Sequence, residues 1–378
     1  MLGKKAFDRV RQEKLFEVLE RLDVDPKMMK AIKSLYNNAQ FAVKINGVES
    51  EWKTQSRGIR QGCPLSPYLF ICLMTVMFKD VHKDLNLQRG LRESISFTEL
   101  LYADDTVLIT NNVHAMNRFL AKIESHAAYY GLRFNKAKCV SLVINSTNQP
   151  RFSNGDKVPA RKSTVYLGAI INISDEAKQD INTRVGSCMA TLNKLYFFWK
   201  KSNCPIGFKL NVFDAVIRSK LVYSLEAVQL SPNMLQKMNA VQFRGLRRIL
   251  GLEHTYVNRS NTNIKLLQEA NKIKNPKQKP NKNIRPFSEY VHVRQESLLK
   301  HIVRCSNLDP MRETTLRYGS AMPRTIVNRR VGRPKQQWST SVYQRLWIKN
   351  RFGTEEAFKS NTERSIITME PHIRNKSI

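Results

Sequence analysis

The sequence predicts an α+β fold followed by a helical region. Over residues 1–172, short strand-like runs joined by tight turns alternate with amphipathic helices, a pattern that favours hairpins packed on helices over regular βαβ repeats. From about residue 173 the strand patterns stop, and apolar residues recur with the helical period of 3.6. The chain has 378 residues, 42% of them hydrophobic, which is enough for two or three domains with buried cores.

The first elements are marked by caps and turn residues. An amphipathic run predicts a helix that ends near residue 23, and Asp25 then caps a second helix that has Pro26 at its first position. The run "FAVKINGVESEW" (41–52) predicts a hairpin whose turn is Asn46-Gly47.

A glycine-bearing loop then leads into a strongly apolar helix, which we expect Ser66 to cap, with Pro67 following. The run "FTELLYADDTVLIT" (97–110) predicts a second hairpin with Ala103, Asp104 and Asp105 at its tip. A helix over about 113–130 is expected next. Further strands are expected within "GLRFNKAKCVSLVI" (131–144) and "STVYLGAIINI" (163–173).

Beyond these strands, three helical runs predict a bundle over 173–252. The stretch "KIKNPKQKPNKNIRP" (272–286) carries six basic residues, three prolines and no acidic residue, which indicates a linker or an exposed basic arm. We therefore expect a basic linker over 253–290 and a basic, mostly helical tail over 291–378.

The charge of the chain indicates a polyanionic partner. Lys and Arg number 63 against 31 Asp and Glu, a formal net charge of +32, so nucleic acid is the first candidate and an anionic membrane surface the second. The longest apolar stretch (68–78) is too short to span a bilayer, and no signal peptide is evident. We expect an intracellular protein, nuclear or cytoplasmic and not secreted, with no membrane partner and with its six scattered cysteines reduced.

Asp104 and Asp105 are adjacent carboxylates in an otherwise apolar run. Held about 4 Å apart, such a pair repels by on the order of 4 kcal/mol at an effective dielectric constant of 20. Asp is also an ordinary turn residue, so the pair alone has a plain structural explanation. A divalent cation between the carboxylates would remove the repulsion, and two-metal phosphoryl transfer uses such an arrangement.

Five motifs carry a family resemblance. "YADD" (102–105) resembles the metal-binding hairpin of reverse transcriptases, and "RGIRQGCPLSP" (57–67) is similar to the second palm motif in the form typical of non-LTR (LINE-like) retrotransposons. "KAFDRV" (5–10) looks like the end of the first motif, "GLRFNKAK" (131–138) like the fourth, and "YLG" (166–168) like the primer-grip hairpin. Their order and spacing also match the family, so the chain resembles the C-terminal portion of a non-LTR reverse transcriptase.

The resemblance implies an RNA-directed DNA polymerase with a partial palm over 1–172, an antiparallel sheet with packed helices, and a helical thumb over 173–252. It implies Mg²⁺, or Mn²⁺, bound by Asp104 and Asp105, with an RNA template, a DNA primer and dNTPs as partners. The resemblance does not indicate whether the chain is a monomer or an oligomer. A catalytic role falls on Asp104, Asp105 and Lys138, nucleotide binding on Phe7, Gln61 and Gly62, and the primer grip on Tyr166, Leu167 and Gly168.

Plain alternatives stand beside these roles. Phe7 could be core, the glycines could serve a tight turn, Lys138 could be a solvated lysine and Tyr166–Gly168 a buried hairpin. In the family's first motif, the aspartate that bridges both metals falls on Leu2, while Asp8 matches a position that does not bind metal. The fingers and the upstream endonuclease of the family are also missing from the sequence.

We therefore expect a truncated and impaired polymerase. The alternative is a catalytically inactive, basic remnant that binds nucleic acid. A group II intron maturase shares the palm motifs, but Cys63 within the second motif and the region after residue 250 favour the retrotransposon.

Overall fold

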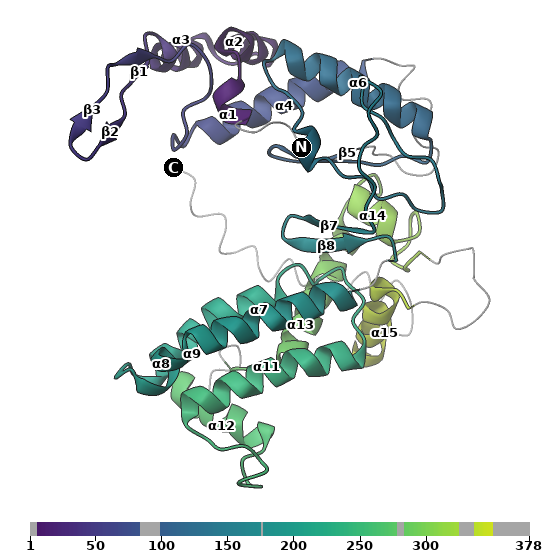
Figure 1. The fold of residues 1–378 in the computed structure, drawn as a ribbon. Helices are drawn as coiled ribbons and strands as arrows, with labels where there is room; N and C mark the ends of the chain where they lie inside the picture. Colours follow the sequence, from purple (N-terminus) through teal and green to yellow (C-terminus); the bar gives the residue numbers. More distant parts are fainter. Residues whose placement is uncertain (1–5, 84–98, 175–176, 278–282, 325–335, 351–378) are drawn as a thin grey trace. The chain divides into compact units, whose positions relative to one another are not determined.

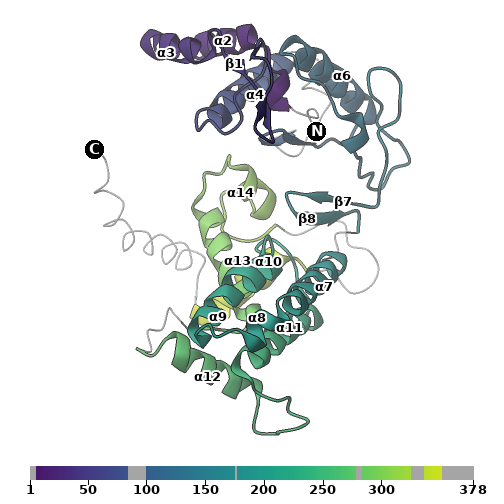
Figure 2. The same cartoon turned by 60° about the vertical axis from the view of Figure 1, so that its left-hand side comes forward.

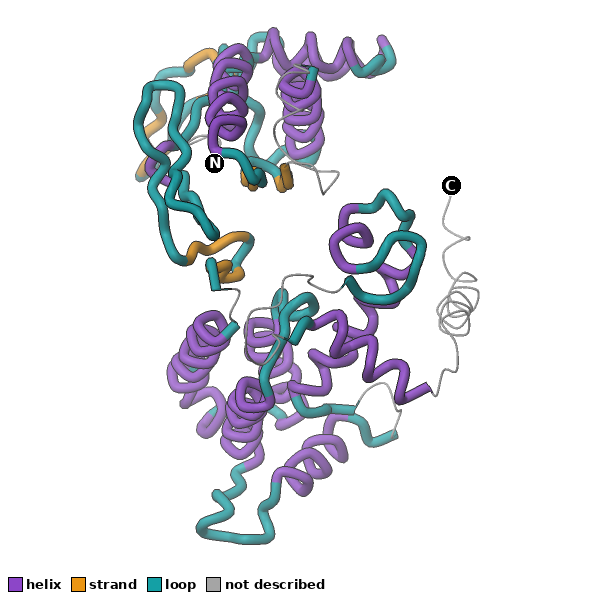
Figure 3. The backbone as a smooth tube through the Cα atoms, turned by 90° about the vertical axis from the view of Figure 1, so that its right-hand side faces the viewer, coloured by secondary structure: helices purple, strands orange, loops and turns teal. Residues whose placement is uncertain are grey.

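The computed structural model describes residues 6–83, 99–174, 177–277, 283–324 and 336–350 (Figure 1). The chain divides into two compact units, residues 1–164 and 165–378, which are described separately below. Helices and short strand pairs make up the described residues, so the α+β prediction holds at this level (Figure 3). Each sheet among them has two strands, and the larger sheet expected of a palm is not formed there.

The first unit contains five helices and three strand pairs within its described residues. The helices are α1 (Ala6–Arg9), α2 (Gln12–Arg21), α3 (Pro26–Tyr36), α4 (Ser66–His82) and α6 (Val113–Tyr129), with a 3₁₀ turn, η1, at Lys136–Lys138. The strand pairs are β1 (Gln40–Phe41) with β4 (Lys53–Thr54), β2 (Lys44–Ile45) with β3 (Val48–Glu49), and β5 (Glu99–Tyr102) with β6 (Asp105–Leu108).

Helix α4 forms the centre of the first unit. It packs against α2 and α6 (Figure 1), and Leu73, Met77 and Val81 on α4 are completely buried. The helix is apolar around most of its circumference because it is covered on more than one side. Burial of this helix therefore organises the unit.

Several local predictions can be compared with the structure. The Asp25 side chain caps α3 by accepting hydrogen bonds from the backbone N–H groups of Lys27 and Met28, as predicted. Asn46-Gly47 forms the turn of the β2–β3 hairpin, also as predicted. The prediction that Ser66 caps α4 is wrong. Ser66 is the first helical residue, and its hydroxyl donates to the carbonyl of Arg60 instead.

The strand predicted within 131–144 is also wrong. The described chain turns through η1 and then makes a single bridge, between Ser141 and Ala160. Cys139 packs with Leu120, Phe152 and Val158 in a small separate core, so side-chain burial replaces a hydrogen-bonded ladder. The apolar alternation that indicated a strand reflects this burial.

Within its described residues the second unit is mainly helical, with one hairpin, β7 (Ser163–Tyr166) with β8 (Ala169–Asn172), whose first strand begins just before the boundary between the units. Helices α7 and α11 run side by side, with α9, α12 and α13 packed on α11 (Figure 2). The helices are α7 (Lys178–Lys194), α8 (Tyr196–Lys201), α9 (Ile206–Phe213), α10 (Ser219–Val222), α11 (Pro232–Leu250), α12 (Asn263–Lys274), α13 (Phe287–Arg304), α14 (Pro310–Thr315) and α15 (Trp338–Asn350), with a π-helical turn, η2, at Asp214–Arg218.

The expected linker, residues 253–290, is not a simple linker. It contains α12, whose Leu266 and Ala270 are buried, and Ile284 is buried as well. The prediction gave too much weight to the basic and proline residues of 272–286, part of which lies outside the described residues. The apolar positions of α12 supply enough burial to fold the segment onto α9 and α11.

Two findings bear on the broader predictions. All six cysteines lie among the described residues, and none forms a disulfide. None of the described helices has the length and apolar character needed to cross a bilayer.

A charged cluster joins three segments of the first unit. The Arg21 guanidinium donates to both carboxylate oxygens of Asp80, at 2.8 Å from Nη1 to Oδ2 and 2.5 Å from Nη2 to Oδ1. Tyr130 donates its hydroxyl to the same carboxylate at 3.0 Å. The Arg21 hydrogen bond is the main cause that lowers the pKa of Asp80, while burial and then Asp80 raise the pKa of Tyr130 to about 12.

We predict that Asp80→Asn lowers the free energy of unfolding by about 1–2 kcal/mol at pH 7, since a charge-assisted, partly exposed hydrogen bond is lost. The carboxyl pKa is lower in the folded protein than the unfolded value of about 3.9, so this stabilisation exists above that pH and disappears as the pH falls through the folded pKa. Urea unfolding at pH 7 and pH 3 measures it. Glu20→Gln, which alters the exposed pair with Lys33, is the control and should change little. An Asp80→Asn effect of equal size at both pH values would contradict the prediction.

Candidate functional site

The acidic doublet lies at a hairpin tip, as predicted. Strands β5 and β6 pair Tyr102 with Asp105, so the turn consists of Ala103 and Asp104. Ala103 has a φ of +51°, in the left-handed region that residues other than glycine seldom adopt. Asp105 is exposed and Asp104 half-buried. The turn therefore leaves two carboxylates at the surface of the hairpin.

The hairpin is attached to the core of the first unit by its strands. The Glu99 carboxylate on β5 lies 2.7 Å from Nε2 of His82, the last residue of α4. Leu108 on β6 packs against both apolar clusters of the unit. Thr106 is buried, and its hydroxyl has no hydrogen-bond partner within the described part of the chain. Thr106 thus points inward at the position after Asp105, where the alternation of a strand directs it.

The first and second motifs are joined by backbone hydrogen bonds. The Gly58 N–H donates to the Val10 carbonyl at 2.8 Å, and the Ile59 N–H donates to the Phe7 carbonyl at 2.7 Å. A side-chain bond accompanies them, because Nε2 of Gln61 donates to Oδ1 of Asp8 at 2.7 Å. The structure thus places Gln61, a predicted nucleotide-binding residue, against the segment that carries Phe7.

The fourth motif meets the same segment from another direction. The Arg11 N–H donates to the Tyr130 carbonyl at 3.1 Å. A Cβ atom at Gly131 would lie 2.5 Å from the carbonyl oxygen of Arg9, and one at Gly58 would lie 2.9 Å from Cα of Asp8. Both glycines have positive φ. Glycine is therefore required where the second and fourth motifs cross the first.

Phe7 and Gly62, predicted to bind the nucleotide, and Lys138, predicted to be catalytic, differ in how they are held. Phe7 is half-buried and stacks on Phe70 of α4, with ring centroids 4.7 Å apart and planes inclined by 16°. Gly62 has a φ of +86° with no atom within 4 Å of an added Cβ, so space remains beside it. Lys138 ends η1 with an exposed side chain. Packing against Phe70 thus explains why Phe7 is half-buried. Lys138 is exposed, as a solvated surface lysine would be.

The Tyr166–Gly168 turn belongs to the second unit, apart from the doublet. Leu167 and Gly168 both have positive φ. The Tyr223 hydroxyl donates to the Leu167 carbonyl at 2.9 Å, and Nη2 of Arg184 lies 3.4 Å from the Gly168 carbonyl oxygen. Hydrogen bonds from outside the hairpin therefore hold its tip.

Sequence reasoning missed the residues that support this turn. Arg184 and Asp180 on α7 form a buried ion pair, with 2.7 Å between Nε and Oδ2, and Arg184 also donates to the Tyr223 carbonyl. The sequence did offer one indication of the ion pair: Asp180 and Arg184 are four residues apart within a helix that has an apolar stripe. Its link to the hairpin arises only from the tertiary fold.

The metal site is incomplete within the described residues. They contain no group of three or more His, Cys, Asp or Glu side chains that could hold a metal ion. Asp104 and Asp105 supply two carboxylates of the kind that Mg²⁺ prefers. Leu2, which the motif resemblance aligns with the bridging aspartate, lies outside the described residues. The donor set present thus fits a divalent cation in kind but lacks a third carboxylate.

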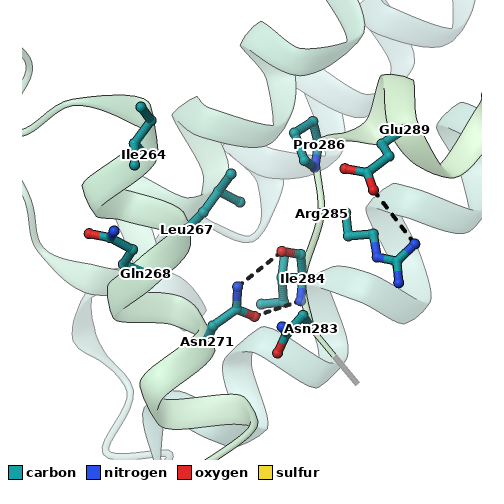
Figure 4. A pocket seen from close by; sticks show the side chains of 9 residues that line it. All are labelled: Ile264, Leu267, Gln268, Asn271, Asn283, Ile284, Arg285, Pro286 and Glu289. Atoms are coloured by element: carbon teal, nitrogen blue, oxygen red, sulfur yellow. Dashed lines mark hydrogen bonds and ion pairs between the residues drawn. The ribbon is translucent and has the colours of Figure 1, made fainter. Parts of the chain in front are cut away.

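The second unit has a cavity of about 480 Å³ between α12 and the start of α13 (Figure 4). The Asn271 amide spans one side, accepting from the Ile284 N–H at 2.6 Å and donating to the Ile284 carbonyl at 3.1 Å. Arg285 and Glu289 pair at 3.6 Å on another side. The Asn271 amide and the Arg285–Glu289 pair are thus already bonded within the unit.

Comparisons with known proteins agree with the motifs. Residues 3–171 match the family described as reverse transcriptase (RNA-dependent DNA polymerase). The chain is 25% identical over 350 residues to the RNA-directed DNA polymerase from mobile element jockey of Drosophila melanogaster, covering 87% of this chain and 34% of that protein. It is 29% identical over 141 residues to the retrovirus-related Pol polyprotein from type-1 retrotransposable element R2 of Nasonia vitripennis, covering 37% and 14%.

These findings confirm the resemblance to non-LTR reverse transcriptases, and by this resemblance residues 3–171 form a nucleotidyltransferase domain. The chain is also 30% identical over 142 residues to the Transposon TX1 uncharacterized 149 kDa protein of Xenopus laevis, covering 38% of this chain and 11% of that protein. The chain thus spans about a third or less of the length of these relatives.

We predict that Gly58→Ala and Gly131→Ala each lower the free energy of unfolding by about 3 kcal/mol or more, because an added Cβ meets backbone atoms at positive φ. Gly155→Ala is the matched control. Gly155 has a φ of +85° with no atom within 4 Å, so only the strain of about 1 kcal/mol applies. Urea unfolding followed by circular dichroism measures all three variants, and equal losses would contradict the proposed crossing.

Proposed function

We propose that this chain is the polymerase region of a non-LTR retrotransposon reverse transcriptase, which extends a primer 3′-OH with dNTPs along an RNA template. One observation carries the proposal. Within a single unit that matches the reverse transcriptase family, the first, second and fourth motifs converge on Phe7–Arg11, and the acidic doublet projects from a hairpin on the same core. A chance match would not bring separated motif residues into direct contact.

In this proposal Asp104 and Asp105 supply oxygen ligands for Mg²⁺, or for Mn²⁺. The metal would lower the barrier by activating the attacking hydroxyl and stabilising the leaving pyrophosphate. Binding a cation would also offset the repulsion between two adjacent carboxylates at the hairpin tip.

Residues of this chain would bind and orient the nucleotide around the metal. Asp8 accepts one N–H of the Gln61 amide, which leaves the other N–H and the amide oxygen to contact an incoming nucleotide. Asp8 is thus a positioning residue. Phe7, stacked on Phe70, would present a fixed ring to the sugar, and Gly62 would let the ligand approach the backbone closely. Lys138 would place a positive charge near the leaving pyrophosphate.

The turn at Tyr166, Leu167 and Gly168 would hold the primer end. Arg184 and Tyr223 occupy the carbonyls of Gly168 and Leu167, which fixes the turn through a buried ion pair on α7. A fixed turn loses less entropy on binding than a mobile one would. The net charge of +32 would attract template and primer together.

We further propose that polymerisation is impaired, because Leu2 replaces the bridging carboxylate. A site with two carboxylates should bind Mg²⁺ weakly and lose most of its rate. The second candidate function is therefore a basic protein that binds nucleic acid without turnover. Its support is the charge of +32 together with the absence of a third carboxylate among the residues the structure describes.

Primer extension on an RNA template tests the role of the doublet. We expect Asp104→Asn and Asp105→Asn to reduce the extension rate by on the order of 100-fold and to weaken binding of Mn²⁺, measured by its electron paramagnetic resonance signal. Asp156→Asn, at an exposed turn, is the control and should leave both unchanged. The second function is supported if neither the wild-type protein nor any variant extends the primer while the affinity for nucleic acid falls steeply with salt. On duplex DNA, the logarithm of the binding constant should then fall against the logarithm of the salt concentration with a slope of about −0.9 per neutralised phosphate.

Restoring the missing carboxylate tests the proposed cause of impairment. We expect Leu2→Asp to raise the rate of Mg²⁺-dependent extension by about tenfold or more, since it completes the ligand set. Leu2→Asn has nearly the same shape without the charge, and it should leave the rate unchanged. An equal gain in both variants, or in neither while the protein stays folded and monomeric, would contradict the alignment of Leu2 with the metal ligand.

A further inference from the structure

The first unit has a cavity of about 420 Å³ at the crossing of its three motif segments. Four arginines from three stretches of the chain line it, together with one acid. The lining residues are Asp8, Arg9, Arg11, Arg57, Ala128, Gly131, Leu132 and Arg133. We call Arg9, Arg11, Arg57 and Arg133 the arginine pocket. Of its four side chains, that of Arg11 is half-buried and the other three are exposed.

Two of these arginines are held together by the backbone. Arg11 and Arg57 form an antiparallel bridge, which places their side chains directly opposite each other. Like charges at such positions are destabilising. The fold therefore sets two arginines at opposed positions of a bridge, where like charges repel.

The charge of the pocket is not neutralised from within. None of its four guanidinium groups forms an ion pair or a side-chain hydrogen bond with any other residue that the structure describes. Asp8 is the one acid in the lining, and its Oδ1 already accepts from Gln61. Four positive charges against one negative charge leave an excess of three around a single cavity.

The walls of the pocket are also fixed. The glycine contacts at Gly58 and Gly131 hold the backbone of Asp8 and Arg9 from two sides. Gln12 adds a bond from its side-chain amide to the Gly58 carbonyl at 3.1 Å. The arginines thus project from a backbone that is positioned before any ligand arrives, which lowers the entropy lost on binding.

We propose that the arginine pocket binds adjacent phosphate groups of a polyanion. A guanidinium group offers paired N–H donors that match phosphate oxygens, and several of them together favour a ligand with more than one negative charge. The phosphates could belong to a nucleic-acid backbone or to the polyphosphate chain of a nucleotide or pyrophosphate. The inference deepens the proposed function and rests on it only for the expectation that such ligands reach the site.

A binding measurement on the full chain tests the pocket. The double variant Arg11→Ala/Arg57→Ala removes the opposed pair. Arg118→Ala/Arg161→Ala removes the same charge from two exposed arginines of the same unit whose side chains have no partner in its described part, and serves as the control. The probes are inorganic tripolyphosphate, titrated by calorimetry, and a fluorescent 12-nucleotide DNA strand, titrated by anisotropy.

We expect the pocket variant to lose about tenfold or more in affinity for at least one probe, and the control less than about twofold, because each guanidinium–phosphate pair is a charge-assisted interaction. A loss confined to tripolyphosphate identifies a nucleotide or pyrophosphate site, and a loss confined to DNA identifies a backbone site. Equal affinities of the wild-type, pocket and control proteins for both probes overturn the proposal.

A stability measurement guards against a merely unfolded variant. Since Arg11 and Arg57 repel, Arg57→Met should raise the unfolding midpoint at low salt and diminish its rise on addition of tripolyphosphate. A lower midpoint and an unchanged response to tripolyphosphate would assign Arg57 a purely structural role and overturn the proposal. Failure of the proposed polymerase would appear separately, as intact pocket-dependent binding with no primer extension.

Discussion

The first unit depends on one backbone crossing, in which the segment Phe7–Arg11 is bonded on one side by Gly58 and Ile59 and met on the other by Tyr130 and Gly131. These are main-chain contacts, and the approach is too close for any residue larger than glycine. The crossing brings Gln61, one of the residues proposed to bind the nucleotide, against the short segment that carries Phe7, another of them. It also creates the cavity in which the arginines gather, so the candidate site and the anion pocket share one structural cause.

The sequence predicted the local features that depend on neighbouring residues. The Asp25 cap, the Asn46-Gly47 turn and the hairpin that carries Asp104 and Asp105 follow from turn and cap chemistry, which acts within a few residues. The helical character of the second unit followed from the 3.6-residue period. The strand expected near Cys139 failed because an apolar alternation records burial, and a small core buries these residues without pairing them.

Contacts between distant residues could not be predicted in this way. The motif resemblance named Gln61, but its bond to Asp8 exists only because Gly58 brings the two segments together. Arg184 and Tyr223 were missed for the same reason, since nothing in their surroundings in the sequence connects them to the Leu167 turn. The arginine pocket draws on three stretches of a chain rich in arginine, where composition gives no means of choosing among its arginines.

In the first unit, the contacts that hold the fold together are made by other residues than the acidic doublet. The crossing is made by backbone atoms from Phe7 to Arg11, and the doublet hairpin is attached through Glu99 and Leu108. None of these contacts involves the carboxylates of the doublet. Residues other than the two proposed metal ligands therefore make the contacts that build the crossing and attach the hairpin. If the doublet binds the metal and the arginine pocket binds phosphates, as proposed, binding of nucleic acid and polymerisation depend on different residues, and a change in the metal ligands would remove the second while leaving the first.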